Sequence, residues 1–328
     1  MGLRLIRDNT KVDFYKYRYV NYAISVGLIL LCVGFFFARD MNYGIDFKGG
    51  ILIESRLKQA PNLAELRKNM EALNLGEITL TTVGKDTDIL LRVAQQPGGE
   101  KAQAEAVERI KKVLGEGTEY RRVESVGPKV GAELVRDGII AVSLALVGIM
   151  FYVWLRFEWQ FAVAGIIATA HDTILTVGLY AVFGLEFNLT TIAAAMTIAG
   201  YSINDTVVVF DRMRENLRKY KRMDLPQLMN LSINETLPRT IATSVTTGLA
   251  ALALFLFGGP VIHDFSLAIL LGIIWGTYSS ICVAAPLVLL LGISREAMQR
   301  VKKDDEAETP EKEPTPPATP TTPAVRKG

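Results

Sequence analysis

The sequence has 328 residues, of which 50% are hydrophobic and 21% are charged, and its formal net charge is +2. This near balance of charge gives no indication of a nucleic-acid partner. The two cysteines, Cys32 and Cys282, lack the spacing of a metal site and predict no disulfide framework. The averages hide a strong segregation of apolar from charged segments, so the order along the chain is more informative than the totals.

Six apolar segments are long enough to cross a membrane, since a helix needs about 20 mainly apolar residues to cross the hydrocarbon core. The first is followed by "FFFARDMNYGIDF", which offers no small-residue cleavage site, so we expect a retained anchor and not a signal peptide. The sequence thus predicts a bundle of six transmembrane helices, over residues 20–38, 138–155, 161–183, 189–210, 240–258 and 265–292.

Lys and Arg concentrate before the first span, between spans two and three, and between spans four and five, where Arg212 to Arg239 are predicted to fill or bound a loop. The loops "FGLEFN" and "GGPVIHD" carry neither residue. Because basic loops stay on the cytoplasmic side, this distribution predicts that both termini lie inside. Residues 1–19 are then a cytoplasmic segment that leads into the first span.

The large segment between the first two spans, residues 39–133, is predicted to be a soluble domain on the outside. Its patterns indicate a β-α-β-β-α-β order, which is the ferredoxin-like α+β arrangement. It contains no nucleophile–base pair, phosphate loop or ligand cluster, so we expect a binding or lever domain without catalytic residues, metal or cofactor. The expected strands cover 50–57, 77–84, 88–94 and 119–127, and the expected helices cover 62–74 and 100–115.

Residues 134–292 are assigned to the remaining five spans, and residues 293–328 are predicted to form a cytoplasmic tail. From about residue 302 the tail is rich in Pro, Thr and charge. Such a composition cannot bury enough apolar surface to order itself, so this part is expected to be disordered.

Asn204 and Asp205 lie inside the fourth predicted span. A charge near the bilayer centre costs about 2.5–3.5 kcal/mol on insertion scales. Helical spacing places Tyr201 and Asp205 on one face, and the third and fifth spans carry similar polar stripes. Lipid-facing stripes are expensive, so these should face one another or a partner. The stripes comprise Thr190, Ala194, Thr197, Tyr201 and Asp205; Thr169, Asp172, Thr176 and Tyr180; and Thr240, Thr243 or Ser244, and Thr247.

Interhelical hydrogen bonding alone explains Ser and Thr in such stripes, whereas carboxylates favour proton or ion coupling. We assign that role to Asp205 and leave it open for Asp172, which as a neutral acid would simply bond a neighbour. His171 lies one residue off the stripe, where we expect it to pack as a neutral side chain, with a proton relay as the alternative. Arg239 follows Pro238 at the predicted start of span five, where it either extends to the interface or, as we expect, pairs with Asp205.

The motif "GIDFKGG" (44–50) follows the first span. Gly44, Gly49 and Gly50 allow tight turns into the first strand. We expect this segment to dock the soluble domain onto the membrane part, with Asp46 either in the docking contact or simply solvated.

Four further stretches join this motif: "SVGPKVGAEL" (125–134), "HD" (171–172), "GYSINDTVVVFDRMREN" (200–216) and "PRTIATSVTT" (238–247). Together they resemble the SecF family, the smaller membrane subunits of the SecD–SecF pair in bacterial protein export. The resemblance covers residues 15–295 and leaves out the N-terminal dozen residues and the tail.

The resemblance implies half of a resistance–nodulation–division transporter in the bacterial inner membrane, with SecD supplying the other spans. It implies use of the proton-motive force to draw a translocating preprotein outward beside the SecYEG channel, with YajC and YidC as further partners. The family's essential carboxylate and arginine correspond to Asp205 and Arg239. Membrane lipid is an expected contact, and nucleic acid is not.

Two other functions compete: a proton-driven small-molecule exporter of the same superfamily, and a structural partner without ion traffic. Six spans are about half of what a self-sufficient exporter needs, although a homodimer would supply the rest, and a larger porter domain is missing from the sequence. Asp205 argues against a purely structural role.

Overall fold

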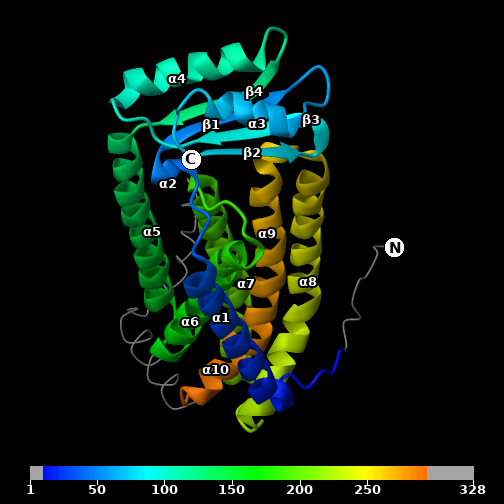
Figure 1. Cartoon of the computed structure of the whole chain (residues 1–328). Helices are drawn as coiled ribbons and strands as arrows, with labels where there is room; N and C mark the ends of the chain where they lie inside the picture. Colours follow the sequence, from blue (N-terminus) through cyan, green and yellow to red (C-terminus); the bar gives the residue numbers. More distant parts are fainter. Residues whose placement is uncertain (1–9, 294–328) are drawn as a thin grey trace, which may run out of the picture. The chain divides into compact units, whose positions relative to one another are not determined.

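The computed structural model describes residues 10–293, apart from the side chains of Pro128, Lys129, Pro260 and Val261. Six of its helices are long and apolar enough to span a membrane, which confirms the predicted bundle (Figure 1). The predicted tail from about residue 302 lies outside the described residues. The spanning helices are α1 (Arg18–Arg39), α5 (Pro128–Arg156), α6 (Trp159–Phe183), α7 (Leu189–Lys219), α8 (Leu225–Phe257) and α9 (Pro260–Ser279), the last continued by a π-helical turn (Ser280–Ala284) and α10 (Ala285–Leu290).

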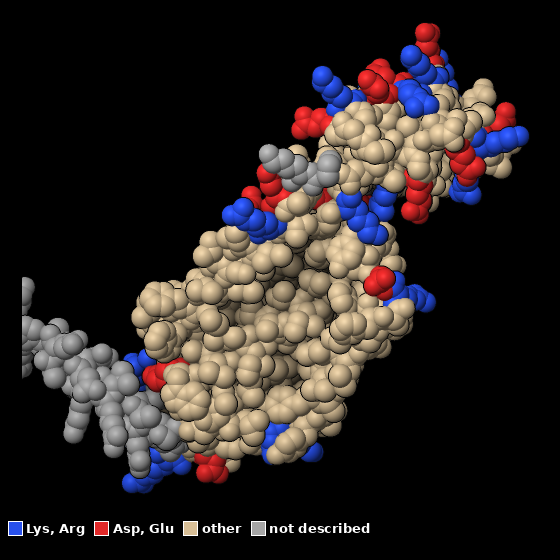
Figure 2. Space-filling model, turned by 60° about the vertical axis from the view of Figure 1, so that its left-hand side comes forward, with Lys and Arg blue, Asp and Glu red and all other residues tan. Residues whose placement is uncertain are grey.

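The centre of the bundle is formed by α6, α7 and α9, which pack against one another. Half of the most apolar stretch of α6 is buried inside the protein, compared with 6% for α5. Figure 2 shows charged side chains gathered over the sheet domain and at the far end of the bundle, with mostly uncharged side chains between. This distribution is the one expected of helices that face hydrocarbon.

The basic loop predicted between spans four and five is mostly helical, which corrects the sequence-based boundaries. Helix α7 continues to Lys219 and α8 already begins at Leu225. Hydropathy marks only the part of a helix within the hydrocarbon core, whereas these extensions are held by polar contacts such as Arg212 Nε to Glu235 Oε2 at 2.7 Å. Pro238 therefore lies inside α8, not at its start.

The soluble domain also ends earlier than the sequence-based boundary at residue 133. Helix α5 begins at Pro128, immediately after the last strand, so residues 128–133 belong to the spanning helix. Proline suits the first turn of a helix because its missing N–H would have no partner there.

The soluble domain has the predicted β-α-β-β-α-β order and is ferredoxin-like. Its four antiparallel strands follow the order β2-β3-β1-β4 across the sheet, and Ile53 of β1 lies opposite Leu91 of β3 and Val123 of β4. The elements are β1 (Gly50–Arg56), α3 (Leu63–Glu71), β2 (Ile78–Val83), β3 (Lys85–Val93), α4 (Gly99–Leu114) and β4 (Glu119–Val126).

The two faces of this sheet differ. Helices α3 and α4 cover one face, where Ile53, Leu91 and Ile110 are fully buried in an apolar core. The opposite face carries Glu54, which lies opposite Leu90 and Arg122. A short helix that was not predicted, α2 (Ile45–Lys48), contributes Ile45 to a small cluster with Leu52 and Val126. The sheet therefore has its own core and a charged second face.

This separate core predicts that residues 40–127, expressed as a fragment, fold alone and unfold cooperatively. Ile110→Ala should lower the free energy of unfolding by about 2–5 kcal/mol, because it opens a cavity in the core. The exposed Glu105→Ala on the same helix should change it by less than about 0.5 kcal/mol. Urea titration followed by circular dichroism measures both, and a fragment without a cooperative transition would overturn the domain assignment.

Candidate functional site

Asp205 of α7 is a buried carboxylate with few partners. Only 2% of the residue is exposed. Its Oδ1 accepts a long hydrogen bond of 3.5 Å from the Thr243 hydroxyl of α8, and its Oδ2 is buried without a partner among the described residues. Burying a charged group without compensating bonds is unfavourable, so this carboxylate has a physical reason to bind a proton.

Arg239 lies on α8 one turn before Thr243, and the residue is exposed. Within residues 10–293 no ion pair joins its guanidinium to Asp205, although its charge acts on that carboxylate over a longer distance. The direct pairing expected from the sequence is therefore not observed. Because α8 continues through Pro238, Arg239 is a mid-helix residue on an exposed part of α8.

The other two residues predicted around Asp205 differ in exposure, since Tyr201 is half-buried and Asn204 is exposed. Tyr201 donates from its hydroxyl to Ser244 Oγ of α8 at 3.4 Å. Asn204 is exposed, and it continues an exposed stripe of small and polar residues along α7 that includes Thr197 and Gly200. The predicted polar face of α7 thus divides into a buried part near Asp205 and a part that the described residues of this chain leave uncovered.

Asp172 of α6 differs from Asp205, because its fully buried carboxylate has hydrogen-bond partners on both oxygens. His171 Nδ1 lies 2.8 Å from Oδ1, and the hydroxyls of Ser202 on α7 and Ser279 on α9 each donate to Oδ2 at 2.5 Å. Asp172 therefore connects the three central helices. His171 contacts it directly and is buried, although the sequence placed its side chain off the polar stripe.

Ser202, Ser279 and the π-helical turn after Ser279 were not predicted. Ser280 of that turn shares a 2.8 Å hydrogen bond with Thr206 of α7. Such turns occur often at functional sites in helices. A usable signal was present in the pair of serines shortly before Pro286, whose missing N–H disturbs a regular helix.

The "GIDFKGG" segment lies against the loop between α6 and α7. Gly44 N–H donates to the Phe187 carbonyl at 2.8 Å, and Asp46 Oδ2 accepts from the N–H of Leu189, the first residue of α7, at 2.9 Å. A Cβ at Gly44 would approach Glu186 Oε1 to 2.6 Å and Asn188 Cβ to 3.1 Å, so a larger residue there requires the Glu186 side chain to move. Asp46 thereby binds the first N–H of the helix that carries Asp205, next to Asn188, which is the N-cap residue of that helix.

The following glycines turn the chain into β1. Gly49 and Gly50 have φ values of 72° and 126°, which favour glycine. Glu186 of the α6–α7 loop, which lies against Gly44, forms an ion pair with Arg92 of β3. Burial raises the pKa of Glu186, and the charges of Arg92 and Arg122 oppose this effect. The sheet domain and the start of α7 are therefore tied by both backbone and charged contacts.

Six spanning helices, a ferredoxin-like domain after the first of them, and buried carboxylates in two central helices define a multi-pass membrane protein with an ionisable interior. Residues 106–294 match the family model for the protein export membrane protein SecD/SecF, C-terminal, and residues 34–60 match the SecD/SecF GG motif. The chain belongs to the SecF family of protein translocase subunits.

Two SecF relatives illustrate the match. The chain is 43% identical to the protein translocase subunit SecF of Cereibacter sphaeroides, over 94% of this chain and 97% of that protein. It is 44% identical to the SecF subunit of Rickettsia conorii, over 91% of this chain and 97% of that protein.

Solved structures of SecDF share the fold. The crystal structure of SecDF, a translocon-associated membrane protein from Thermus thermophilus, matches with a TM-score of 0.78 and 38% identity over 88% of this chain. SecDF in a super-membrane-facing form matches with a TM-score of 0.63 and 37% identity over 94% of this chain. This chain spans 39% and 41% of those two chains, respectively.

Proposed function

We propose that this chain is a proton-motive-force-coupled subunit of the bacterial Sec export machinery that acts with a SecD partner. In this proposal it resides in the inner membrane with both termini in the cytoplasm and the ferredoxin-like domain in the periplasm. The observation that carries the proposal is Asp205, a buried carboxylate whose Oδ2 has no partner among the described residues. The names of the relatives favour an export subunit over a small-molecule exporter.

The driving force follows from charge. Moving one elementary charge through 100 mV is worth about 2.3 kcal/mol. Protonation of Asp205 removes its charge and with it the attraction to Arg239. The contact between α7 and α8 then favours a different arrangement, and α7 is tied at its first residue to the sheet domain through Asp46. This is coupling through an element with two states.

The uncovered stripe on α7 supports the SecD partner. An exposed amide such as Asn204 is unfavourable against hydrocarbon, whereas small neighbours such as Gly200 allow close approach of another helix. Well over half of the matched SecDF chain lies outside the match. We infer that SecD supplies the missing half of a resistance–nodulation–division arrangement. SecYEG, YajC, YidC and the preprotein belong to the same proposal through the family resemblance.

Cysteine crosslinking tests the partner. In a background with both native cysteines replaced by alanine, Thr197→Cys and Gly200→Cys should crosslink to cysteines placed in the spans of SecD. Leu144→Cys on α5, which is 67% exposed, is the control for a helix outside the proposed interface. Gel analysis of native membranes reads the products. If the α7 variants captured only second copies of this chain, the heteromeric proposal would be wrong.

A further inference from the structure

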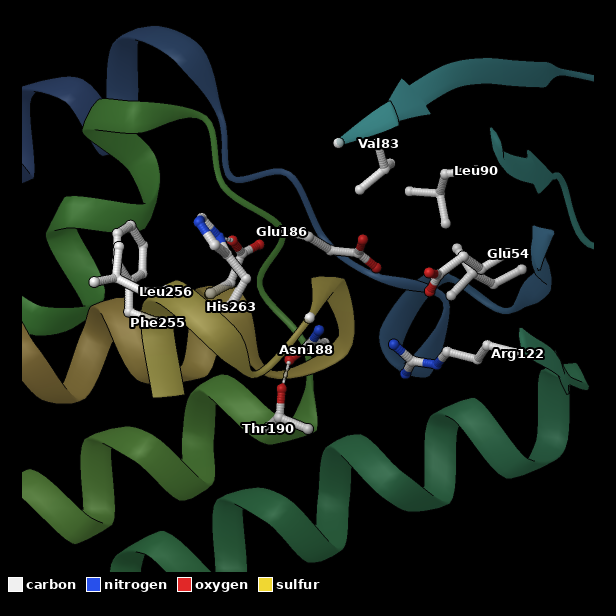
Figure 3. Close-up of a pocket in the computed structure, with 14 residues that line it drawn as sticks. Glu54, Val83, Leu90, Arg122, Glu186, Asn188, Thr190, Phe255, Leu256 and His263 are labelled. Atoms are coloured by element: carbon white, nitrogen blue, oxygen red, sulfur yellow. Dashed lines mark hydrogen bonds and ion pairs between the residues drawn. The ribbon is translucent and has the colours of Figure 1, made fainter. Parts of the chain in front are cut away.

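A cavity of about 480 Å³ lies between the charged face of the sheet and the adjacent ends of α8 and α9 (Figure 3). Glu54 and Leu90 line it from the sheet, Glu186 from the α6–α7 loop, Phe255 and Leu256 from α8, and His263 from α9. In Figure 3 the Glu54 and Glu186 side chains extend toward each other, with Arg122 beside them. The cavity therefore combines an apolar wall with a charged end.

Glu54 is a charged group of the cavity whose Oε1 lacks a hydrogen-bond partner among the described residues. It is 3% exposed, and its Oε1 is buried without a hydrogen bond among the described residues. Its cation contact is Arg121 Nη1 at 3.8 Å, and the same nitrogen lies 3.0 Å from Asp88 Oδ2. A buried carboxylate in this situation is stabilised by an added cation that donates hydrogen bonds.

The other charged groups around the cavity are already paired. Arg122 Nε donates to Glu124 at 2.6 Å, and Glu186 pairs with Arg92. His263 Nδ1 lies 3.0 Å from Asp264 Oδ1, and its side chain is 45% exposed. Glu54 Oε1 thus lacks a cation that donates a hydrogen bond to it, although Arg121 and Arg122 lie nearby.

The position of the cavity limits what supplies that cation. Leu256 is 61% exposed and Phe257 is 85% exposed, and they form the end of the spanning helix α8 beside the sheet domain. In a membrane this end lies at the level of the lipid head groups. A molecule bound here would contact hydrocarbon on one side and Glu54 on the other.

We propose that this cavity binds the head group of an aminophospholipid, with its primary ammonium on Glu54. A primary ammonium has three N–H donors, which match a carboxylate without hydrogen bonds, whereas a choline group has none. The phosphate lies toward His263, and the acyl chains follow Phe255, Leu256 and the exposed end of α8. A lysine of a passing polypeptide offers the same cation, but it does not use the apolar surface at lipid level. The proposal is independent of proton coupling at Asp205.

The experiment uses the full chain, purified in neutral detergent, with lipid binding measured by native mass spectrometry. The probes are dioleoyl phosphatidylethanolamine, its mono- and dimethylated forms, and dioleoyl phosphatidylcholine, so that the N–H donors are removed one at a time. Affinity should fall along this series and be about tenfold or more weaker for phosphatidylcholine. This arm needs no variant, and equal affinity across the series would overturn the proposal.

Variants then locate the site. Glu54→Gln should weaken phosphatidylethanolamine binding about tenfold or more, because it removes the charge from the acceptor. Glu71→Gln, an equally conservative change at an exposed position on α3, should leave it unchanged. A lysine-rich peptide is the competing probe. If Glu54→Gln bound phosphatidylethanolamine as tightly as wild type, or lost only peptide binding, the cavity would not be a lipid site and the proposal would be wrong.

Discussion

Asp205→Asn is expected to abolish the stimulation of protein export by a proton gradient while leaving the abundance and assembly of the complex nearly unchanged. The amide keeps the size of the side chain and an acceptor for the Thr243 hydroxyl, so the packing between α7 and α8 persists. It does not take up a proton at physiological pH, so the charge change that drives the cycle is lost. Export into inverted membrane vesicles, with and without a gradient, measures the effect.

Two comparisons sharpen this result. Asp205→Glu should retain part of the stimulation, because the carboxyl remains but is displaced by about one methylene. Asp211→Asn, on the same helix but in an exposed ion pair with Arg156, should be nearly silent, since such pairs contribute about 0–1 kcal/mol. Gradient-dependent export at the wild-type rate in Asp205→Asn would show that another group carries the proton.

Asp46→Ala is expected to remove most of the gradient-dependent stimulation for a different reason. It deletes the carboxylate that accepts from the Leu189 N–H, about 16 residues or roughly 24 Å along α7 from Asp205. Asn188 still caps the helix, but the unpaired N–H should destabilise the start of α7 by about 1–3 kcal/mol and loosen its tie to the sheet domain. Asp46→Asn keeps an acceptor oxygen and should retain most of the activity.

The same vesicle assay measures this order, in which wild type exceeds Asp46→Asn and Asp46→Asn exceeds Asp46→Ala. Asp86→Ala, at an exposed position on β3, controls for removal of a carboxylate from the domain. Full stimulation in Asp46→Ala would mean that α7 does not act on the domain through this contact, and Asp205 would keep its assigned role.

The elements that could be predicted are those encoded by local patterns. Each spanning helix is a long apolar run, and the strands of the soluble domain alternate with a period of two, so neither requires knowledge of the partner segments. Asp205 was recognisable because a carboxylate inside an apolar run is expensive wherever the helix packs. The short α2 has no comparable periodic signal, and it was expected only as a turn.

The contacts that complete the site depend on which helices meet. Asp172 receives the Ser202 hydroxyl from 30 residues away and the Ser279 hydroxyl from 107 residues away. Asp46 accepts from the first N–H of α7, 143 residues away, and the sequence left it between a docking contact and solvation. Pairing of Arg239 with Asp205 was expected because both were placed toward the inner face, whereas the continuous helix α8 leaves Arg239 exposed. No single-segment pattern contains this information.

The most direct test of the central claim is the protonation of Asp205 itself. Infrared difference spectroscopy on membranes containing the complex detects the C=O stretch of a protonated buried carboxyl when the external pH is changed. We predict a pH-dependent carboxyl band that is present in wild type, persists in Asp172→Asn and is absent in Asp205→Asn. A band that persists unchanged in Asp205→Asn would contradict the account.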